Sequence, residues 1–251
     1  LVASFAPARV RLGYDRARAR DASWLFTNAH LPARPLAHTQ DMYLEFLDAL
    51  GVAHGVPSEP ADWQLGPWPA ERDAARAFHA RLDRPAAAIV VGTSKPEKDW
   101  PSDRWAAVCD ALAADYGLQP VLVGGRSPRE LAAEAAILAA VRHARPLSAL
   151  GSGLRPLVGI LDGAALVLSP DTGPLHASVA LGRPVISLMG YTNPKRVGPY
   201  RRFHDLLIDA YGDPGEDYPV SMAHRAGRMG RITVADVLDR VERWRRAYAG
   251  R

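Results

Sequence analysis

Residues 166–190 read LVLSPDTGPLHASVALGRPVISLMG and carry the strongest fold signal in the chain. An apolar run is followed by a turn, a short helical stretch and a second apolar run. Pro174 suits the first turn of that helix, because the N–H that proline lacks would have no intrahelical partner there. The segment therefore predicts a strand, a tight turn, a short helix and another strand.

The same alternation extends to both sides of this segment, from about residue 86 to 210. Strands are expected at 88–91, 121–123, 165–168, 185–188 and 206–208. Helices are expected over 102–117, with Ser102 as a candidate N-cap, and over 128–143. Strands that alternate with helices in this way are typical of an α/β fold with a parallel sheet.

The ends of the chain follow other patterns. Residues 1 to about 83 contain scattered prolines and one clear helix over 41–50, so we place a domain boundary near Pro85. A last helix is expected over 233–248, because Thr233 and Asp236 have the spacing of a capping box and an apolar stripe follows them.

Composition excludes several classes of protein. The chain has 251 residues, 48% of them hydrophobic and 23% charged, which is the make-up of a soluble globular protein. Its single cysteine, Cys109, excludes a disulfide framework and a cysteine-based zinc site, and favours a reducing compartment. No apolar run reaches the roughly 18 residues of a membrane-spanning helix, and the first residues lack a signal-peptide pattern. A net charge of +4 suits an anionic ligand but is too small for a dedicated nucleic-acid binder.

The turn after the strand at 165–168 is the first candidate site. Asp171, Thr172 and Gly173 lie where the strand ends, and His176 falls in the first turn of the helix. Free N–H groups at a helix N-terminus favour an anion, and a glycine lets a ligand approach the backbone closely. The alternative is that Asp171 and Thr172 only cap the helix and that His176 is a surface residue.

The loop GTSKPEKDWP, residues 92–101, follows the strand at 88–91 and is the second candidate. Ligands of open α/β sheets bind at the carboxyl ends of the strands, so Thr93, Ser94 and Lys98 are expected to face the same crevice as Asp171. Two phosphates could be held between the two loops. The alternative is an ordinary solvated loop. The spacing fits neither a Walker loop nor, at Gly151-Ser152-Gly153, a dinucleotide fingerprint.

The eight histidines show no H-E-x-x-H pattern and no other paired ligand spacing. No metal held by the protein is therefore expected.

Several motifs together resemble the family-nine glycosyltransferases, the bacterial heptosyltransferases of lipopolysaccharide core assembly. They are SPDTGPLH at 169–176, ALGRPV at 180–185, GYTNP at 190–194, GPY at 198–200 and the loop at 92–101. The resemblance covers nearly the whole chain. It implies a GT-B architecture, in which two Rossmann-like domains face each other and the N-terminal one is only partly present here. The expected division is the remainder of the acceptor-side domain at 1–84, the nucleotide-sugar-binding domain at 85–232, and a helix at 233–251 that crosses back toward the first domain.

The resemblance also assigns roles to residues. It places Thr93, Ser94 and Lys98 on the diphosphate of the donor, and it places Asp171, Thr172, Gly173 and His176 on the diphosphate and the adjoining sugar. Lys98 and Asp171 are the expected catalytic residues: Lys98 stabilises the leaving diphosphate, and Asp171 positions the sugar for inverting attack. Metal independence is part of the same expectation, with no cofactor besides the nucleotide-sugar co-substrate.

Two features depart from the family pattern. The family's general base is an aspartate in a loop after the first strand of the N-terminal domain, and no such strand and loop precede Leu1. We expect the base to lie outside this chain, within about 70–90 further residues that would complete a Rossmann-like domain. Asp15 and Asp41 are interpreted as cap or surface residues. Secondly, where members that use an adenine nucleotide often carry an acidic residue, this chain reads Gly124-Gly125-Arg126-Ser127-Pro128, with Glu130 beyond.

The sequence therefore predicts an inverting, metal-independent glycosyltransferase that moves a heptose from a nucleotide-diphosphate donor, ADP-heptose, to an anionic lipopolysaccharide-core or related glycolipid acceptor. No nucleic-acid partner is expected. The expected location is the cytoplasm, with peripheral contact at the inner face of the cytoplasmic membrane left open. Two alternatives remain: a nucleotide-sugar-binding module without transfer activity, and a GT-B nucleotide-sugar epimerase.

Overall fold

The computed structural model describes residue 5 and residues 7–52 and 63–250. Six parallel strands form the central sheet in the order β5-β4-β3-β6-β7-β8. The strands are β3 (Ala86–Val90), β4 (Gln119–Val123), β5 (Leu147–Ser148), β6 (Leu166–Pro170), β7 (Val185–Met189) and β8 (Leu207–Asp209). Their order reverses between β3 and β6, as in a Rossmann sheet. The prediction of an α/β fold with a parallel sheet is confirmed; β5, with only two residues, was not predicted.

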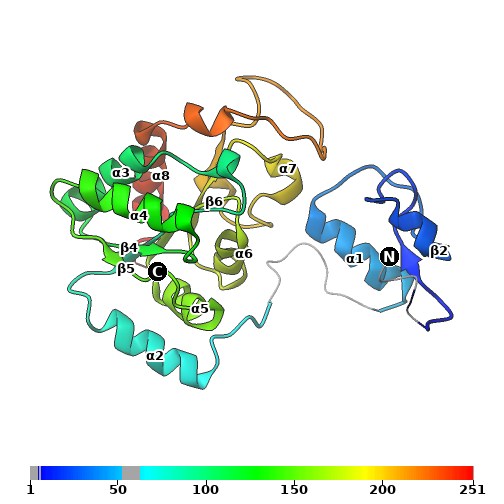
Figure 1. Cartoon of the computed structure of the whole chain (residues 1–251), viewed down its shortest axis with the longest axis horizontal. Coiled ribbons are helices and arrows are strands. Elements are labelled where there is room, and N and C mark those ends of the chain that lie inside the picture. Colours follow the sequence, from blue (N-terminus) through cyan, green and yellow to red (C-terminus); the bar gives the residue numbers. More distant parts are fainter. Residues whose placement is uncertain (1–4, 6, 53–62, 251) are drawn as a thin grey trace.

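Helices cover both faces of this sheet (Figure 1). The helices that connect or follow its strands are α3 (Ser102–Asp115), α4 (Pro128–Ala140), α5 (Leu154–Gly163), α6 (Gly173–Ala180), α7 (Pro194–Val197) and α8 (Val234–Ala247). The four predicted among them, α3, α4, α6 and α8, are present, whereas α5 and α7 were not predicted. The N-cap of α3 is Pro101, and Ser102 is the first helical residue instead of the cap we expected. The capping box of Thr233 and Asp236 is confirmed.

The core has two halves because side chains of a strand alternate between the faces of the sheet. Ala87 and Ile89 of β3 pack with α3, α4 and α8, where Trp105 and Leu112 are fully buried. The other three residues of β3 face α5 and α6 on the opposite side of the sheet. They are Ala86, Ala88 and Val90. Strands buried on both faces read as continuous apolar runs, which is why the sequence revealed them.

The remaining elements precede β3. They are the short strands β1 (Leu12–Gly13) and β2 (Ala29–His30), a 3-10 helix at Ser23–Phe26, α1 (Thr39–Ala49) and α2 (Pro69–His79). The helix predicted over 41–50 corresponds to α1, whereas β1, β2 and α2 were not predicted. α2 packs on α5, where Gly159 lies so close that an added Cβ would be 3.0 Å from Cβ of Ala75.

α1 packs against α7, so the N-terminal segment lies beside the carboxyl edge of the large sheet (Figure 1). Polar contacts join them. Asp41 of α1 accepts hydrogen bonds from the Tyr200 hydroxyl at 2.5 Å and from Arg201 at 3.0 Å. Asp15 binds Arg18 at 2.6 Å. Both aspartates thus have structural partners and are partly buried, and Asp41 is not the N-cap of α1. Their interpretation as cap or surface residues stays a prediction.

His38 caps α1 and also contacts the C-terminal half. Its Nδ1 accepts the N–H of Gln40 at 3.2 Å, so the ring proton of the neutral form lies on Nε2 and is donated to the Gly198 carbonyl at 3.1 Å. Burial, offset in part by the Gly198 contact and by Asp41, lowers the pKa of His38. The neutral ring is therefore the form that fits this junction.

Two further results concern the rest of the chain. Among the described residues, no helix combines the length and apolar character that crossing a bilayer requires. α8 packs against α3 and β8, and Trp244 donates a hydrogen bond to the Ala165 carbonyl at 3.0 Å. The division at 84/85 and 232/233, and the crossing of the last helix toward the first domain, stay predictions.

We expect His38 to make the stability of the chain depend on pH. Because folding lowers its pKa, the unfolded state binds more protons, and the free energy of unfolding should fall as pH decreases from about 7 to 5. His38→Asn keeps a capping acceptor but does not titrate in this range. Urea unfolding followed by tryptophan fluorescence should show a smaller loss in this variant than in the wild type. An equal loss in both would mean that His38 is not the titrating group.

Candidate active site

A crevice of about 1090 Å³ lies at the carboxyl ends of β3, β4 and β6. Its walls come from the loop between β3 and α3, the loop between β4 and α4, the start of α5 and the start of α6. They include Thr93, Ser94, Thr172 and Gly173. This is the position where the strand order of the sheet reverses, at which open α/β sheets bind their ligands. Parts of the two loops singled out from the sequence therefore line one crevice. Lys98 and Asp171 are not among its lining residues, and His176 lines a second pocket with His38 and Tyr200.

The β6–α6 turn presents a helix N-terminus to this crevice. Thr172 is the N-cap of α6, but its side chain makes no cap hydrogen bond and its hydroxyl lies 3.3 Å from that of Ser169. Gly173 begins the helix, and an added Cβ there would meet no heavy atom within 4 Å. First-turn N–H groups without a side-chain cap favour an anion. The alternative, in which Thr172 only caps the helix, is not supported, because the Thr172 side chain makes no cap hydrogen bond.

Lys98 and Asp171 form an ion pair beside this turn. Nζ of Lys98 is 2.6 Å from Oδ2 of Asp171 and 3.4 Å from its backbone oxygen, and both side chains are largely buried. His176 is more exposed, and its Nε2 lies 3.7 Å from Oδ1 of Asp171. Burial on its own would raise the pKa of Asp171, but contacts with His176 and Lys98 hold that pKa far below its ordinary value. The pair fixes an ionised carboxylate and a lysine side by side.

Thr93 and Ser94 differ in their surroundings. Thr93 is buried, and its hydroxyl lies 2.6 Å from the Lys95 carbonyl and 2.7 Å from Oδ1 of Asp99, while it accepts the Lys95 N–H at 3.2 Å. Ser94 is exposed on the crevice wall. The Thr93 hydroxyl thus shapes its own loop, whereas Ser94 has a side chain open to a ligand.

Sequence reasoning missed part of the crevice. The β4–α4 loop lines it with Arg126 and Arg129, and the segment before α5 lines it with Gly151 and Gly153. Both glycines have positive φ, of 71° and 90°. A signal was present in the glycines that follow the strand ends, but it was set aside because the spacing did not match a dinucleotide fingerprint.

Glu130 has a local role in the β4–α4 loop. Its carboxylate accepts the N–H of Gly125 at 2.6 Å, and the N–H and hydroxyl of Ser127 at 3.0 and 2.7 Å, in a capping box for α4. Arg129 pairs with Asp99 at 2.8 Å and also donates to the Thr93 carbonyl. These contacts join the β4–α4 loop to the loop that carries Lys98.

Within residues 7–52 and 63–250, no group of three or more His, Cys, Asp or Glu side chains is arranged to hold a metal ion. Metal independence itself stays a prediction.

Comparison with known proteins identifies the family. The family model for glycosyltransferase family 9 (heptosyltransferase) matches residues 1–212. The chain belongs to glycosyltransferase family 9. The resemblance inferred from the motifs is thereby confirmed.

Individual proteins that resemble this chain are described as heptosyltransferases or family 9 glycosyl transferases. The lipopolysaccharide core heptosyltransferase OpsX of Haemophilus influenzae is 29% identical over 221 residues, which are 84% of this chain and 61% of the relative. Among solved structures, a family 9 glycosyl transferase from Veillonella parvula has a TM-score of 0.72 at 23% identity, covering 94% of this chain and 67% of its own. The ADP-heptose lipopolysaccharide heptosyltransferase II of E. coli has a TM-score of 0.68 at 21% identity, with coverages of 94% and 69%. The likeness to these solved structures confirms the GT-B fold prediction.

We expect Lys98→Met to destabilise the protein by about 1–3 kcal/mol near pH 7, because it leaves a buried carboxylate without its cation. The low pKa of Asp171 adds stability above the unfolded pKa of about 4, and this contribution is lost as pH falls through the folded pKa. The deficit of the variant should therefore shrink in acid. Urea unfolding from about pH 7 to 3.5 measures it.

The matched control for Lys98→Met is Arg76→Met. Arg76 pairs with Asp73 on an exposed face of α2, where both side chains are at least 70% exposed. Such a pair should contribute less than about 0.5 kcal/mol at any pH. If the two variants lose similar stability, the Lys98–Asp171 pair is no stronger than a surface contact.

Proposed function

We propose that the chain binds the nucleotide-sugar donor of a heptosyltransferase in the crevice between the β3, β4 and β6 loops. The observation that carries this proposal is the uncapped N-terminus of α6 beside the Lys98–Asp171 pair, at the edge of a crevice of about 1090 Å³. An N–H cluster and an ammonium group at one edge suit a diphosphate. The chain spans about 61% of OpsX, so the activity of the complete relative comes to this chain as a proposal.

The proposed chemistry is cleavage of the bond between the anomeric carbon and the diphosphate oxygen. As this bond breaks, negative charge grows on the diphosphate, and groups fixed in advance stabilise it without reorganising. The N–H groups at Thr172 and Gly173 and the ammonium of Lys98 fill that role. Asp171, kept ionised by Lys98, accepts a hydrogen bond from a sugar hydroxyl and orients the ring, while Ser94 and His176 contact the diphosphate and the sugar next to it.

Relatives in the family support the choice of donor and acceptor. E. coli heptosyltransferase II, which shares the fold, is described as an ADP-heptose enzyme, and OpsX as a lipopolysaccharide core heptosyltransferase. We therefore propose ADP-heptose as donor and an anionic core glycolipid at the inner membrane face as acceptor. In the proposed transfer, an acceptor hydroxyl attacks the anomeric carbon from the side opposite the leaving diphosphate, a general base takes the hydroxyl proton, and no metal takes part.

Gly173→Ala tests the phosphate contact. An added methyl group meets no protein atom, so the melting temperature should not change, but it would occupy the space through which a phosphate reaches the α6 N–H groups. We expect ADP affinity, measured by titration calorimetry, to fall about tenfold or more, because charge-assisted hydrogen bonds are lost. Gly230→Ala is the control, because it also has open space and lies outside the crevice wall. Unchanged ADP binding in Gly173→Ala would remove α6 from the site.

A transfer assay tests the function as a whole. The complete gene product, with any residues that precede Leu1, should release ADP from ADP-heptose only when a lipopolysaccharide core acceptor is present, and should do so in EDTA. The 251-residue chain should bind ADP-heptose by itself, because the proposed donor crevice is formed by its own residues. Nucleotide release without acceptor would favour an epimerase, and binding without release by the complete product would favour a binding module.

A further inference from the structure

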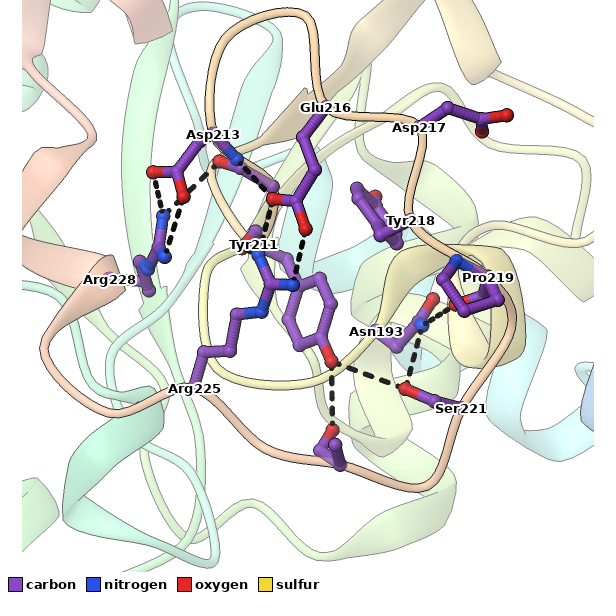
Figure 2. Close-up of polar contacts among 12 residues, drawn as sticks. Asn193, Tyr211, Asp213, Glu216, Asp217, Tyr218, Pro219, Ser221, Arg225 and Arg228 are labelled. Carbon is purple, nitrogen blue, oxygen red and sulfur yellow. Dashed lines mark hydrogen bonds and ion pairs between the residues drawn. The ribbon is translucent and has the colours of Figure 1, made fainter.

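α7 is held rigidly at the carboxyl edge of the sheet by the loop that follows β8. The side chain of Asn193, the N-cap of α7, accepts the N–H of Lys195 at 3.0 Å. The same side chain donates to the Pro219 carbonyl at 2.8 Å (Figure 2). Ion pairs close the rest of this loop: Arg225 binds Glu216 at 2.6 Å, and Arg228 binds Asp213 at 2.5 Å. These hydrogen bonds and ion pairs hold α7 against the loop that follows β8.

Arg196 of α7 has no partner that accounts for its burial. Only 8% of the residue is exposed, and its Nε is buried without a hydrogen bond. Across the part of the chain that the structure describes, no ion pair or hydrogen bond of its guanidinium is found. Burying an unpaired charge costs several kcal/mol, so such a group points to a ligand that supplies the missing acceptor.

The surroundings of Arg196 are positively charged. Burial and the neighbouring Arg20 both lower the pKa of Arg196, whereas Asp171 raises it. Asp171 is already paired with Lys98 at 2.6 Å, so it does not neutralise Arg196 as well. Arg20 donates to the sulfur of Met222 at 2.9 Å, and sulfur is a weak acceptor. His224, nearby, has a pKa lowered by burial and then by Lys95 and Arg196.

The position of Arg196 separates it from the donor crevice. Neither Arg196 nor Arg20 belongs to the walls of that crevice. Arg20 and Tyr43, both in the N-terminal segment, are among the groups whose charge shifts the pKa of Arg196, and α1, which carries Tyr43, packs on α7. If the proposed function holds, this junction is where an acceptor would lie, and the effect of Asp171 on the pKa of Arg196 places the two charges within electrostatic reach of each other.

We propose that Arg196, assisted by Arg20, binds a phosphate or carboxylate group of the acceptor. A guanidinium matches either oxyanion through paired N–H donors, and a fixed guanidinium loses little freedom on binding. This inference rests on the proposed function, because it needs an anionic acceptor beside the donor crevice. An anion bound here places the acceptor next to Asp171 and thus next to the sugar to be transferred.

Binding measurements with the complete gene product test the inference without turnover. The probes are ADP and a deacylated lipopolysaccharide core oligosaccharide that keeps its phosphates and carboxylates. In titration calorimetry, Arg196→Gln should lower the affinity for the oligosaccharide about 10- to 100-fold and should change the affinity for ADP less than about twofold. Arg20→Gln should weaken the oligosaccharide to a smaller degree. Arg246→Gln, an equal charge change on exposed α8, should alter neither affinity.

Two further arms identify the anion and guard against misfolding. Either dephosphorylation of the oligosaccharide or esterification of its carboxylates should abolish the difference in affinity between the wild type and Arg196→Gln. The treatment that does so identifies the anionic group that Arg196 binds. Arg196→Lys keeps a positive charge at this position and should recover part of the affinity, and circular dichroism checks that each variant is folded. If Arg196→Gln folds and weakens ADP binding as much as oligosaccharide binding, Arg196 belongs to the donor site and the inference is wrong. If the variant folds and both affinities are unchanged, Arg196 binds no ligand and the inference is also wrong. If it does not fold, unchanged oligosaccharide affinity in Arg20→Gln overturns the inference.

The outcome is distinguishable from failure of the proposed function. If the wild type binds the oligosaccharide through Arg196 but releases no ADP from ADP-heptose, the anion site stands and the transfer proposal fails. If transfer occurs with normal acceptor KM in Arg196→Gln, the transfer proposal stands and the anion site is wrong.

Discussion

The ion pair between Lys98 and Asp171 joins the two loops on which the crevice depends. One partner follows β3 and the other follows β6, the two strands between which the sheet order reverses, and 2.6 Å separates Nζ from Oδ2. Each charge compensates the desolvation of the other, so neither loop can move away without exposing or stranding its partner. The same contact keeps the carboxylate ionised and brings the ammonium to the N-terminus of α6. Stability and the arrangement of the site therefore share one interaction.

Sequence and structure agree most closely where burial on both faces forces a continuous apolar run. β3, β4, β6 and β7 have this character, and each was located to within a few residues. β5 was missed because two exposed residues carry no periodicity. α2 was missed although its sequence carries helix signals, namely Pro69 at its start, Glu71 in its first turn and Arg76 in its last turn. It has no buried residue and packs on α5.

The candidate site shows the same division. The two loops could be predicted to meet, because the carboxyl ends of parallel strands share an edge. The direct contact of Lys98 with Asp171 could not, since it depends on how a loop of ten residues folds over the sheet. Arg196 escaped notice for a similar reason: an arginine in a short polar segment looks solvated in the sequence, and only packing under α1 and the β8 loop reveals its burial.

Gly92 controls how closely two walls of the crevice approach each other. A Cβ at this position would lie 2.5 Å from Cγ of Glu130, the residue whose carboxylate gathers the amides of Gly125 and Ser127. Any side chain at position 92 would displace that carboxylate and loosen the loop above β4. A nucleoside bound here as proposed would meet the Glu130 carboxylate, whose oxygens already accept three hydrogen bonds. Selection among nucleosides would then depend on the width and backbone of the crevice wall more than on a free carboxylate. Changes in donor preference within such a scaffold would then arise through small residues that set wall spacing.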